Sequence, residues 1–188
     1  MILGCVLAGG QSRRFGRDKA LAMLGSKTLL QRAVEQLLGW CDAVVITGRN
    51  TGPACTLPDW PHAFMGPLGG IAAALRYGAT SGYDVVLSLG VDVAGLPDDL
   101  PMRLSPAPRF VESQPVIGLW PTATAPVLET LLESNEKHSM RTFIARLGAY
   151  GVRLPAEPAN INTQSDLDAV LAASANISVC AKEPNHGL

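Results

Sequence analysis

The fold is decided by one stretch of the chain, Ile2-Leu3-Gly4-Cys5-Val6-Leu7-Ala8-Gly9-Gly10-Gln11-Ser12-Arg13-Arg14-Phe15-Gly16-Arg17-Asp18-Lys19. Its first part is an apolar run with the length of a buried strand, and two glycines then end that run. The loop that follows carries several cationic side chains against a single carboxylate. The stretch therefore predicts a buried strand that leads into a cationic, glycine-rich loop.

The chemistry expected of such a loop is anion binding. Glycines lack a Cβ and let backbone N–H groups approach an oxyanion, whose charge the flanking cations then offset. A phosphate chain is the expected ligand. The alternative is a solvated loop whose arginines only keep it soluble, because short glycine motifs are weak signals by themselves. The spacing fits neither the Gly-x-Gly-x-x-Gly dinucleotide motif nor the Gly-x-x-x-x-Gly-Lys-Ser/Thr P-loop.

The composition predicts one globular domain that binds neither nucleic acid nor membrane. The 188 residues are 47% hydrophobic and 16% charged with a net charge of −1, whereas nucleic-acid binders usually carry a basic face. No apolar run approaches the ~20 residues that span a bilayer. The four cysteines form no Cys-x-x-Cys pair, so we expect reduced thiols and a cytoplasmic location. Polar residues without periodicity predict a flexible tail over residues 174–188, after a domain over 1–173.

Strands and helices alternate along the rest of the chain. Thr28 and Gln31 form a capping box at the start of an amphipathic helix that Gly39 ends, and residues 42–47 form a second strand. Strand, helix and strand at this spacing predict a parallel βαβ unit with a right-handed crossover. The remaining elements are predicted as a loop over 48–61, helix 66–78, strand 84–89, a loop-rich segment 97–126 with short strands near 110 and 116–120, helices 126–133 and 139–147, strand 150–154, and a last helix capped by Thr163 and Asp166.

Asp92 follows the third apolar strand, at the edge of the sheet where open α/β folds bind their ligands. A carboxylate in that place must reach solvent or meet a cation, and Mg²⁺ on a phosphate chain is a natural partner. The alternative is a turn or capping residue, which the nearby Pro97-Asp98-Asp99 supports. Together with the cationic loop, a metal role is the better interpretation. Arg14 and Lys19 would then hold a triphosphate and offset the charge that develops as pyrophosphate leaves.

The opening stretch also resembles the signature loop of the molybdenum cofactor guanylyltransferases, a family of nucleotidyltransferases. The family pattern is Leu-Ala-Gly-Gly-x-Ser-x-Arg-Met-Gly-x-Asp-Lys, and this chain has Leu7-Ala8-Gly9-Gly10-x-Ser12-x-Arg14-Phe15-Gly16-x-Asp18-Lys19. Later segments are similar to the family as well: Asp59, Gly66-Pro67-Leu68-x-Gly70-Ile71, Gln114-Pro115 and Asn160-x-Asn162-Thr163. The resemblance covers nearly the whole chain, up to about residue 173.

The resemblance implies a single Rossmann-like domain, a three-layer α/β/α sandwich with a mostly parallel, mixed sheet. It implies transfer of GMP from Mg-GTP to the terminal phosphate of molybdopterin, with release of pyrophosphate. The implied metal cofactor is Mg²⁺, for which Mn²⁺ can substitute. Transient contact with proteins that deliver or accept the molybdenum cofactor is implied as well.

The same resemblance assigns roles to individual residues. Catalysis falls to Arg14, Lys19 and Asp92, and metal binding to Asp92 with Asn162 as a second candidate ligand. The nucleotide-binding residues implied are Leu7, Ala8, Gly9, Gly10, Ser12, Lys19, Thr47, Asp59, Gly66 and Asp92. The acceptor-binding residues implied are Gln114, Asn160 and Asn162.

Two segments depart from the family pattern. The metal strand of the family usually reads Cys-Asp-x-Pro-Phe-Leu-Pro, whereas this chain has Val91-Asp92-Val93-Ala94-Gly95-Leu96-Pro97 and so lacks the first proline. The family tends to place an asparagine at the end of the second strand, where this chain has Thr47-Gly48-Arg49-Asn50. Asn50 or backbone groups would then have to contact the base.

Two alternative functions remain open at this point. One is a cytidylyltransferase, or another nucleotidyltransferase, that acts on a related phosphate acceptor. Cytidylyl relatives resemble Leu-Ala-Ala-Gly at the loop, so Gly9 favours guanine. The other is a non-catalytic, nucleotide-binding regulatory module, against which the joint presence of Arg14, Lys19 and Asp92 counts.

Overall fold

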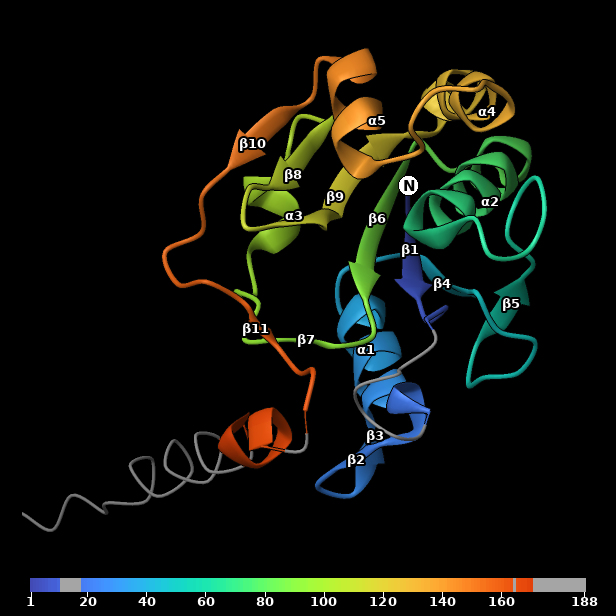
Figure 1. Cartoon of the computed structure of the whole chain (residues 1–188). Coiled ribbons are helices and arrows are strands. Elements are labelled where there is room, and N and C mark those ends of the chain that lie inside the picture. The colour runs from blue at the N-terminus through green and yellow to red at the C-terminus, as the bar shows by residue number, and fades with distance from the viewer. Residues whose placement is uncertain (11–17, 164, 171–188) are drawn as a thin grey trace, which may run out of the picture.

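The computed structural model of the protein describes residues 1–10, 18–163 and 165–170. Its central feature is a seven-stranded sheet with helices on both faces (Figure 1). In the order in which they lie side by side, the strands are β10 (Tyr150–Val152), β8 (Arg109–Val111), β9 (Gln114–Pro121), β6 (Val85–Gly90), β1 (Ile2–Leu7), β4 (Ala43–Thr47) and β5 (Cys55–Leu57).

Neighbouring strands of this sheet pair in parallel, except that β9 runs antiparallel to both β6 and β8. From the central β1 the chain passes through α1 (Leu29–Leu38) to β4 on one side. It then returns through α2 (Gly66–Ser81) to β6 on the other side of β1. The connections therefore diverge at β1, and in open α/β sheets ligands bind beyond the carboxyl ends of the strands at such a point.

The helices form one layer on each face of the sheet, and each layer has its own apolar core. On one face α1 packs against β1 and β4, with Leu37 fully buried. The other face is covered by α2, α4 (Ala125–Glu133) and α5 (Met140–Leu147), where the rings of Trp120 and Phe143 lie 5.3 Å apart. The structure is therefore a three-layer sandwich, as the figure shows (Figure 1).

Short elements complete the fold, and two of them pair at the carboxyl edge of the large sheet. The strand β7 follows β6 and pairs antiparallel with β11, which brings the C-terminal part of the described chain beside the end of β6. A hairpin of β2 and β3 precedes α1. Their bounds and those of the remaining short helices are β2 (Met23–Leu24), β3 (Lys27–Thr28), β7 (Val93–Ala94), β11 (Ala159–Asn160), η1 (Lys19–Leu21), α3 (Leu100–Arg103) and η2 (Thr122–Thr124).

The predicted architecture is confirmed, and so is the predicted start of α1. The Thr28 hydroxyl accepts the Gln31 N–H at 3.1 Å, and the Gln31 side chain accepts the Thr28 N–H at 2.8 Å. These reciprocal bonds are the capping box that the spacing of the two residues predicted, and they satisfy two of the N–H groups that a helix start leaves unpaired.

The prediction is wrong about the loop over 48–61 and about the end of α2. The loop contains β5, an edge strand whose backbone bonds come from pairing with β4, so its local sequence carries little signal. The helix α2 continues past Gly78 to Ser81 and ends at Gly82, which has a φ of 83° and donates its N–H to the Gly78 carbonyl. Gly78 instead serves packing, because a Cβ there would lie 2.8 Å from Thr122. The short helix α3 also lies in a segment, residues 97–126, that was predicted to be loop-rich.

Among the described residues, Cys5, Cys41 and Cys55 are free thiols. Burial raises the pKa of the Cys5 and Cys41 thiols to about 12, so both stay protonated near neutral pH. Within the described part of the chain, no helix has both the length and the apolar character needed to cross a bilayer. The predicted tail over 174–188 lies outside the described residues, as does the domain boundary at 173, and both stay predictions.

Candidate active site

Two features lie at the carboxyl edge of the sheet, on either side of the end of β1. On the β4 side is a pocket of about 530 Å³. On the β6 side is a buried cation, the ammonium of Lys19. Leu7 connects them, because it lines the pocket and its carbonyl accepts the Val91 N–H at 3.2 Å. The two features therefore belong to one edge of the fold.

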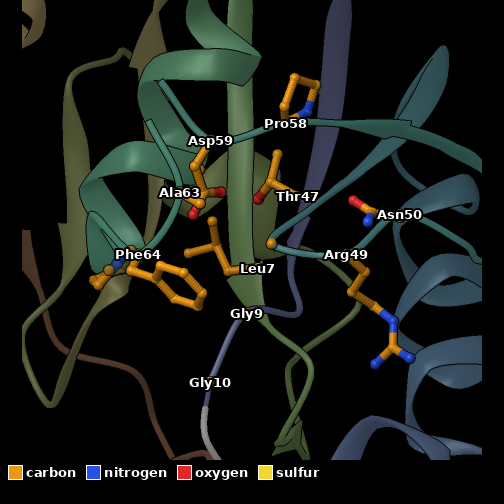
Figure 2. A pocket seen from close by; sticks show the side chains of 14 residues that line it. Leu7, Gly9, Gly10, Thr47, Arg49, Asn50, Pro58, Asp59, Ala63 and Phe64 are labelled. Carbon is orange, nitrogen blue, oxygen red and sulfur yellow. The ribbon is translucent and has the colours of Figure 1, made fainter. Parts of the chain in front are cut away.

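The pocket lies where the loops after β1, β4 and β5 meet the first turn of α2 (Figure 2). Gly9 and Gly48 approach so closely that a Cβ on Gly48 would lie 2.3 Å from the Gly9 Cα. Gly48 also has a φ of 77°, in the region that glycine adopts without strain. The full lining is Leu7, Gly9, Gly10, Thr47, Gly48, Arg49, Asn50, Pro58, Asp59, Ala63, Phe64, Gly66, Pro67 and Gly70.

The start of α2 faces this pocket because the helix packs directly on the end of β4. A Cβ on Gly70 would lie 2.4 Å from the Thr47 Oγ1, so only glycine allows this approach. Gly66 and Pro67 form the first turn of the helix and line the pocket. The unpaired N–H groups and positive dipole end of the helix thus lie next to the pocket, where they favour an anionic ligand.

Lys19 is the centre of the second feature. Its side chain is only 10% exposed. The Nζ donates to the Asp92 Oδ2 at 2.8 Å and to the Asn162 Oδ1 at 2.9 Å. Such partners are needed because burying an uncompensated ammonium is costly. The end of the cationic loop, the turn between β6 and β7 and the segment after β11 thus converge on one nitrogen atom.

Asp92 is positioned by backbone pairing with a neighbouring segment. The segment after Asp92 lacks the proline of the family pattern, and the pairing holds it instead. The Asp92 carbonyl accepts the N–H of the fully buried Ile161 at 2.9 Å. Directly after Asp92, β7 pairs with β11. The segment that departs from the guanylyltransferase pattern is therefore fixed by a neighbouring strand.

Asn162 is positioned by a helix cap. The Asp166 carboxylate accepts the N–H groups of Asn162 and Thr163, both at 2.8 Å, while the Asp166 N–H donates to the Thr163 hydroxyl. These bonds, with the Asn162 N–H first, lower the pKa of the Asp166 carboxyl. The predicted capping pair of Thr163 and Asp166 is confirmed, and residues 165–170 are helical. The cap fixes the backbone from which the Asn162 amide reaches Lys19.

The oxygen donors around Lys19 fit a magnesium ion. Asp92 offers a carboxylate and Asn162 an amide oxygen, and both already face one cation, the Lys19 ammonium. Among residues 1–10, 18–163 and 165–170, no group of three or more His, Cys, Asp or Glu side chains lies close enough together to hold one ion. An ion here would have few protein ligands and would complete its shell with water and phosphate oxygens, as Mg²⁺ commonly does.

Asp59 ties two walls of the pocket together. Burial raises the pKa of its carboxyl, while hydrogen bonds from the backbone N–H groups of Gly48 and Phe64 act in the opposite direction. The bonds connect the loop after β4 with the segment before α2. Asn50, which the sequence offers for contact with a base, also lines this pocket. Thr47, a predicted nucleotide-binding residue, lines it too and is almost fully buried.

Arg49 and Phe64 line the pocket but were not predicted as site residues. Arg49 binds Asp18 through two bonds, Nη2 to Oδ2 at 2.9 Å and Nη1 to Oδ1 at 3.2 Å. Asp18 in turn accepts the Ala20 N–H at the start of η1, so Arg49 anchors the residue next to Lys19. The available signal for Arg49 was a cation directly after a buried strand. For Phe64 it was a large aromatic residue in a proline- and glycine-rich loop.

The structure brings most of the predicted site residues together in three groups. The pocket is lined by six of the predicted nucleotide-binding residues: Leu7, Gly9, Gly10, Thr47, Asp59 and Gly66. The polar cluster consists of Lys19, Asp92 and Asn162. Gln114 and Asn160 lie beside β7, since the Gln114 Nε2 donates to the Pro158 carbonyl at 2.7 Å and Asn160 pairs with Val93. Ala8 is buried behind the pocket, with its N–H bonded to the Thr47 carbonyl at 3.0 Å. Ser12 and Arg14 lie outside the described residues.

The fold is shared with solved structures of low sequence identity. The molybdopterin-guanine dinucleotide biosynthesis protein A of Archaeoglobus fulgidus aligns with a TM-score of 0.73 at 19% identity, over 94% of this chain and 100% of that one. The manganese complex of Rv0371c from Mycobacterium tuberculosis aligns with a TM-score of 0.59 at 13% identity, over 92% and 98% of the two chains. The sheet and its flanking helices therefore follow the class of α/β fold seen in solved nucleotidyltransferase structures.

The sequence comparisons narrow this class to one family. Residues 4–150 match the MobA-like NTP transferase domain. The chain is also 37% identical over 182 residues to the molybdenum cofactor guanylyltransferase of Acidiphilium cryptum, covering 89% of this chain and 92% of that protein. The protein belongs to the MobA-like NTP transferase family, among relatives named molybdenum cofactor guanylyltransferase.

The Arg49–Asp18 pair should contribute to stability in a pH-dependent way. Pairing with Arg49 lowers the pKa of the Asp18 carboxyl, so its contribution is complete above the ordinary carboxyl pKa and is lost as pH falls through the lowered one. A double-mutant cycle with Arg49→Gln and Asp18→Asn should give a coupling of about 0.5–1 kcal/mol at pH 7 in urea unfolding. The coupling should fall as the pH is lowered below the ordinary pKa of an aspartate. A coupling that does not change with pH would contradict the ion pair.

Proposed function

We propose that the protein transfers GMP from GTP to the terminal phosphate of molybdopterin and releases pyrophosphate. In this reaction an oxygen of the acceptor phosphate attacks the α-phosphorus of GTP, and the bond between the α- and β-phosphates breaks. The proposal draws on guanylyltransferase relatives that match along nearly nine-tenths of the chain. The observation that carries the site is the buried Lys19 ammonium, which donates to two side-chain oxygens at the same sheet edge as the pocket.

The pocket is assigned to the base and ribose of GTP. Its volume of about 530 Å³ is within the ordinary range for small-molecule sites. Bare backbone at Gly9 and Gly48 allows a nucleotide to approach closely, and the start of α2 favours phosphate nearby. With the base in the pocket, the phosphates would extend past the end of β1 toward Lys19.

Lys19 is assigned to the phosphates and to the departing pyrophosphate. Nucleotidyl transfer asks a protein chiefly to position charged groups and to neutralise them. The Lys19 ammonium is held in place before substrate arrives, so little reorganisation is needed when negative charge develops. Arg14 is also assigned to the negative charge of the departing pyrophosphate. This assignment comes from the sequence pattern, because Arg14 lies outside the described residues.

Asp92 and Asn162 are assigned to Mg²⁺. When bound, the ion supplies positive charge to the phosphate oxygens and orients them. Mn²⁺ accepts the same oxygen ligands and should substitute. The Lys19 ammonium, which Asp92 and Asn162 now share, would stay close enough to contact phosphate once the carboxylate faces a metal.

The acceptor is assigned to the β6 side of the edge, opposite the base. Gln114, Asn160 and Asn162 lie there, around the β7–β11 pair that also holds Asp92. Molybdopterin would therefore present its phosphate to the α-phosphorus from the side facing away from the pocket. We expect the enzyme to act in the cytoplasm, with transient contacts to proteins that deliver or accept the cofactor.

Removal of the Lys19 ammonium should slow turnover strongly. Lys19→Ala is expected to lower kcat about 10²–10³-fold, because it deletes charge stabilisation made in the transition state. Pyrophosphate release with GTP, Mg²⁺ and molybdopterin measures this directly. Lys27→Ala is the matched control, since Lys27 makes a surface ion pair with Glu35.

The same assay distinguishes the alternatives. Turnover with CTP in preference to GTP would replace the guanylyl assignment by the cytidylyl one. Nucleotide binding without pyrophosphate release by the wild type would support a regulatory module. A Lys19→Ala variant as active as the wild type would remove Lys19 from the mechanism.

Asp92→Asn should shift the metal dependence rather than the affinity for the base. The Mg²⁺ concentration at half-maximal activity should rise about tenfold or more, because an amide is a weaker ligand than a carboxylate. The matched control is Asp98→Asn, an exposed carboxylate of the same loop. An unchanged Mg²⁺ titration of Asp92→Asn would contradict the ligand role.

A further inference from the structure

Phe64 combines two features that folding alone does not favour. Its side chain is 90% exposed, so the ring gains almost nothing from burial. Its backbone φ is 70°, in the left-handed region. Among the described residues, Phe64 is the non-glycine residue with a positive φ. Bulky residues adopt this conformation only at a cost in free energy, and such residues cluster at ligand sites.

The surrounding structure holds Phe64 in this conformation. The Asp59 carboxylate accepts the Phe64 N–H and also the Gly48 N–H, so the residue is tied to the loop after β4. Two residues later, Gly66 begins α2 with a φ of 66°. The segment thus has fixed hydrogen bonds on one side and a helix start on the other. The position of the ring is set by these neighbours rather than by a hydrophobic core.

The ring lines the pocket. Figure 2 shows the Phe64 ring beside the Leu7 side chain, with Asp59 and Ala63 above it and Asn50 across the cavity. An exposed aromatic face next to an aliphatic side chain can accept a flat ring by stacking. Polar groups at Asp59 and Asn50 lie at the same cavity, where the edge of that ring would be.

We propose that Phe64 is the stacking residue for the purine base of the bound nucleotide. The inference rests on the proposed function, because it takes the pocket as the site for GTP. Stacking of a base on an aromatic side chain is worth enough to change affinity by about 5- to 150-fold. Because Phe64 lies at the rim of the pocket, the expected effect is near the low end, about tenfold.

Titration calorimetry with two probes tests the assignment: GTP, and inorganic tripolyphosphate, which has no base. Phe64→Ala should weaken GTP binding about tenfold and leave tripolyphosphate binding unchanged, because only the base contacts the ring. Phe64→Tyr should keep the affinity for GTP, whereas Phe64→Leu, apolar but without a π face, should lose it. Tyr77→Ala is the control, an aromatic side chain of α2 that does not line the pocket.

Four outcomes would overturn the inference. GTP affinity that is unchanged in Phe64→Ala contradicts stacking and leaves the proposed function intact. Equal losses for GTP and tripolyphosphate mean that the variant disturbs the whole site, and a loss in Tyr77→Ala as large as in Phe64→Ala means the same. Wild-type protein that binds tripolyphosphate but not GTP would overturn the proposed function together with the inference.

Discussion

The site depends on one contact, the buried Lys19 ammonium held between the Asp92 carboxylate and the Asn162 amide. A cation with so little exposure requires oxygen partners, and these come from segments far apart in the chain. Asp92 is supplied by the end of β6, and Asn162 by the strand pairing and cap that follow β11. The contact therefore closes the C-terminal part of the described chain onto the first loop. Both partners also have the oxygen atoms that Mg²⁺ prefers, which is why the proposed metal and phosphates are assigned to this contact.

The position of the pocket follows from the topology of the sheet. Connections leave β1 toward β4 on one side and β6 on the other, which opens a crevice beyond the end of β1. Glycine at positions 9 and 48 keeps two backbone segments in close contact there. Gly70 lets α2 pack closely against Thr47 at the end of β4. The Arg49–Asp18 pair then joins the pocket wall to the residue preceding Lys19. The pocket and the Lys19 cluster are thus connected, which suits the proposed reaction because it depends on alignment of base and phosphates.

Features with local causes could be predicted from the sequence, whereas features created by distant contacts could not. The capping boxes of Thr28 and Thr163 and the strand–helix–strand order depend on residues a few positions apart, and all are confirmed. The strand β5 was missed because its partner β4 provides its hydrogen bonds. Phe64 was missed because exposure and backbone conformation are invisible in the sequence. The lost proline near Asp92 is compensated by β11, a partner more than 60 residues away that no local pattern indicates.

The central claim is that the phosphates of GTP bind at Lys19 and Asp92 while the base occupies the pocket. A crystal structure of the wild-type protein with Mg²⁺ and a non-hydrolysable GTP analogue tests this most directly. The predicted result is a guanine among the pocket residues, a phosphate oxygen within hydrogen-bond distance of the Lys19 Nζ, and the Asp92 carboxylate on the metal. A nucleotide whose phosphates point away from Lys19, with the metal bound to neither Asp92 nor Asn162, would contradict it.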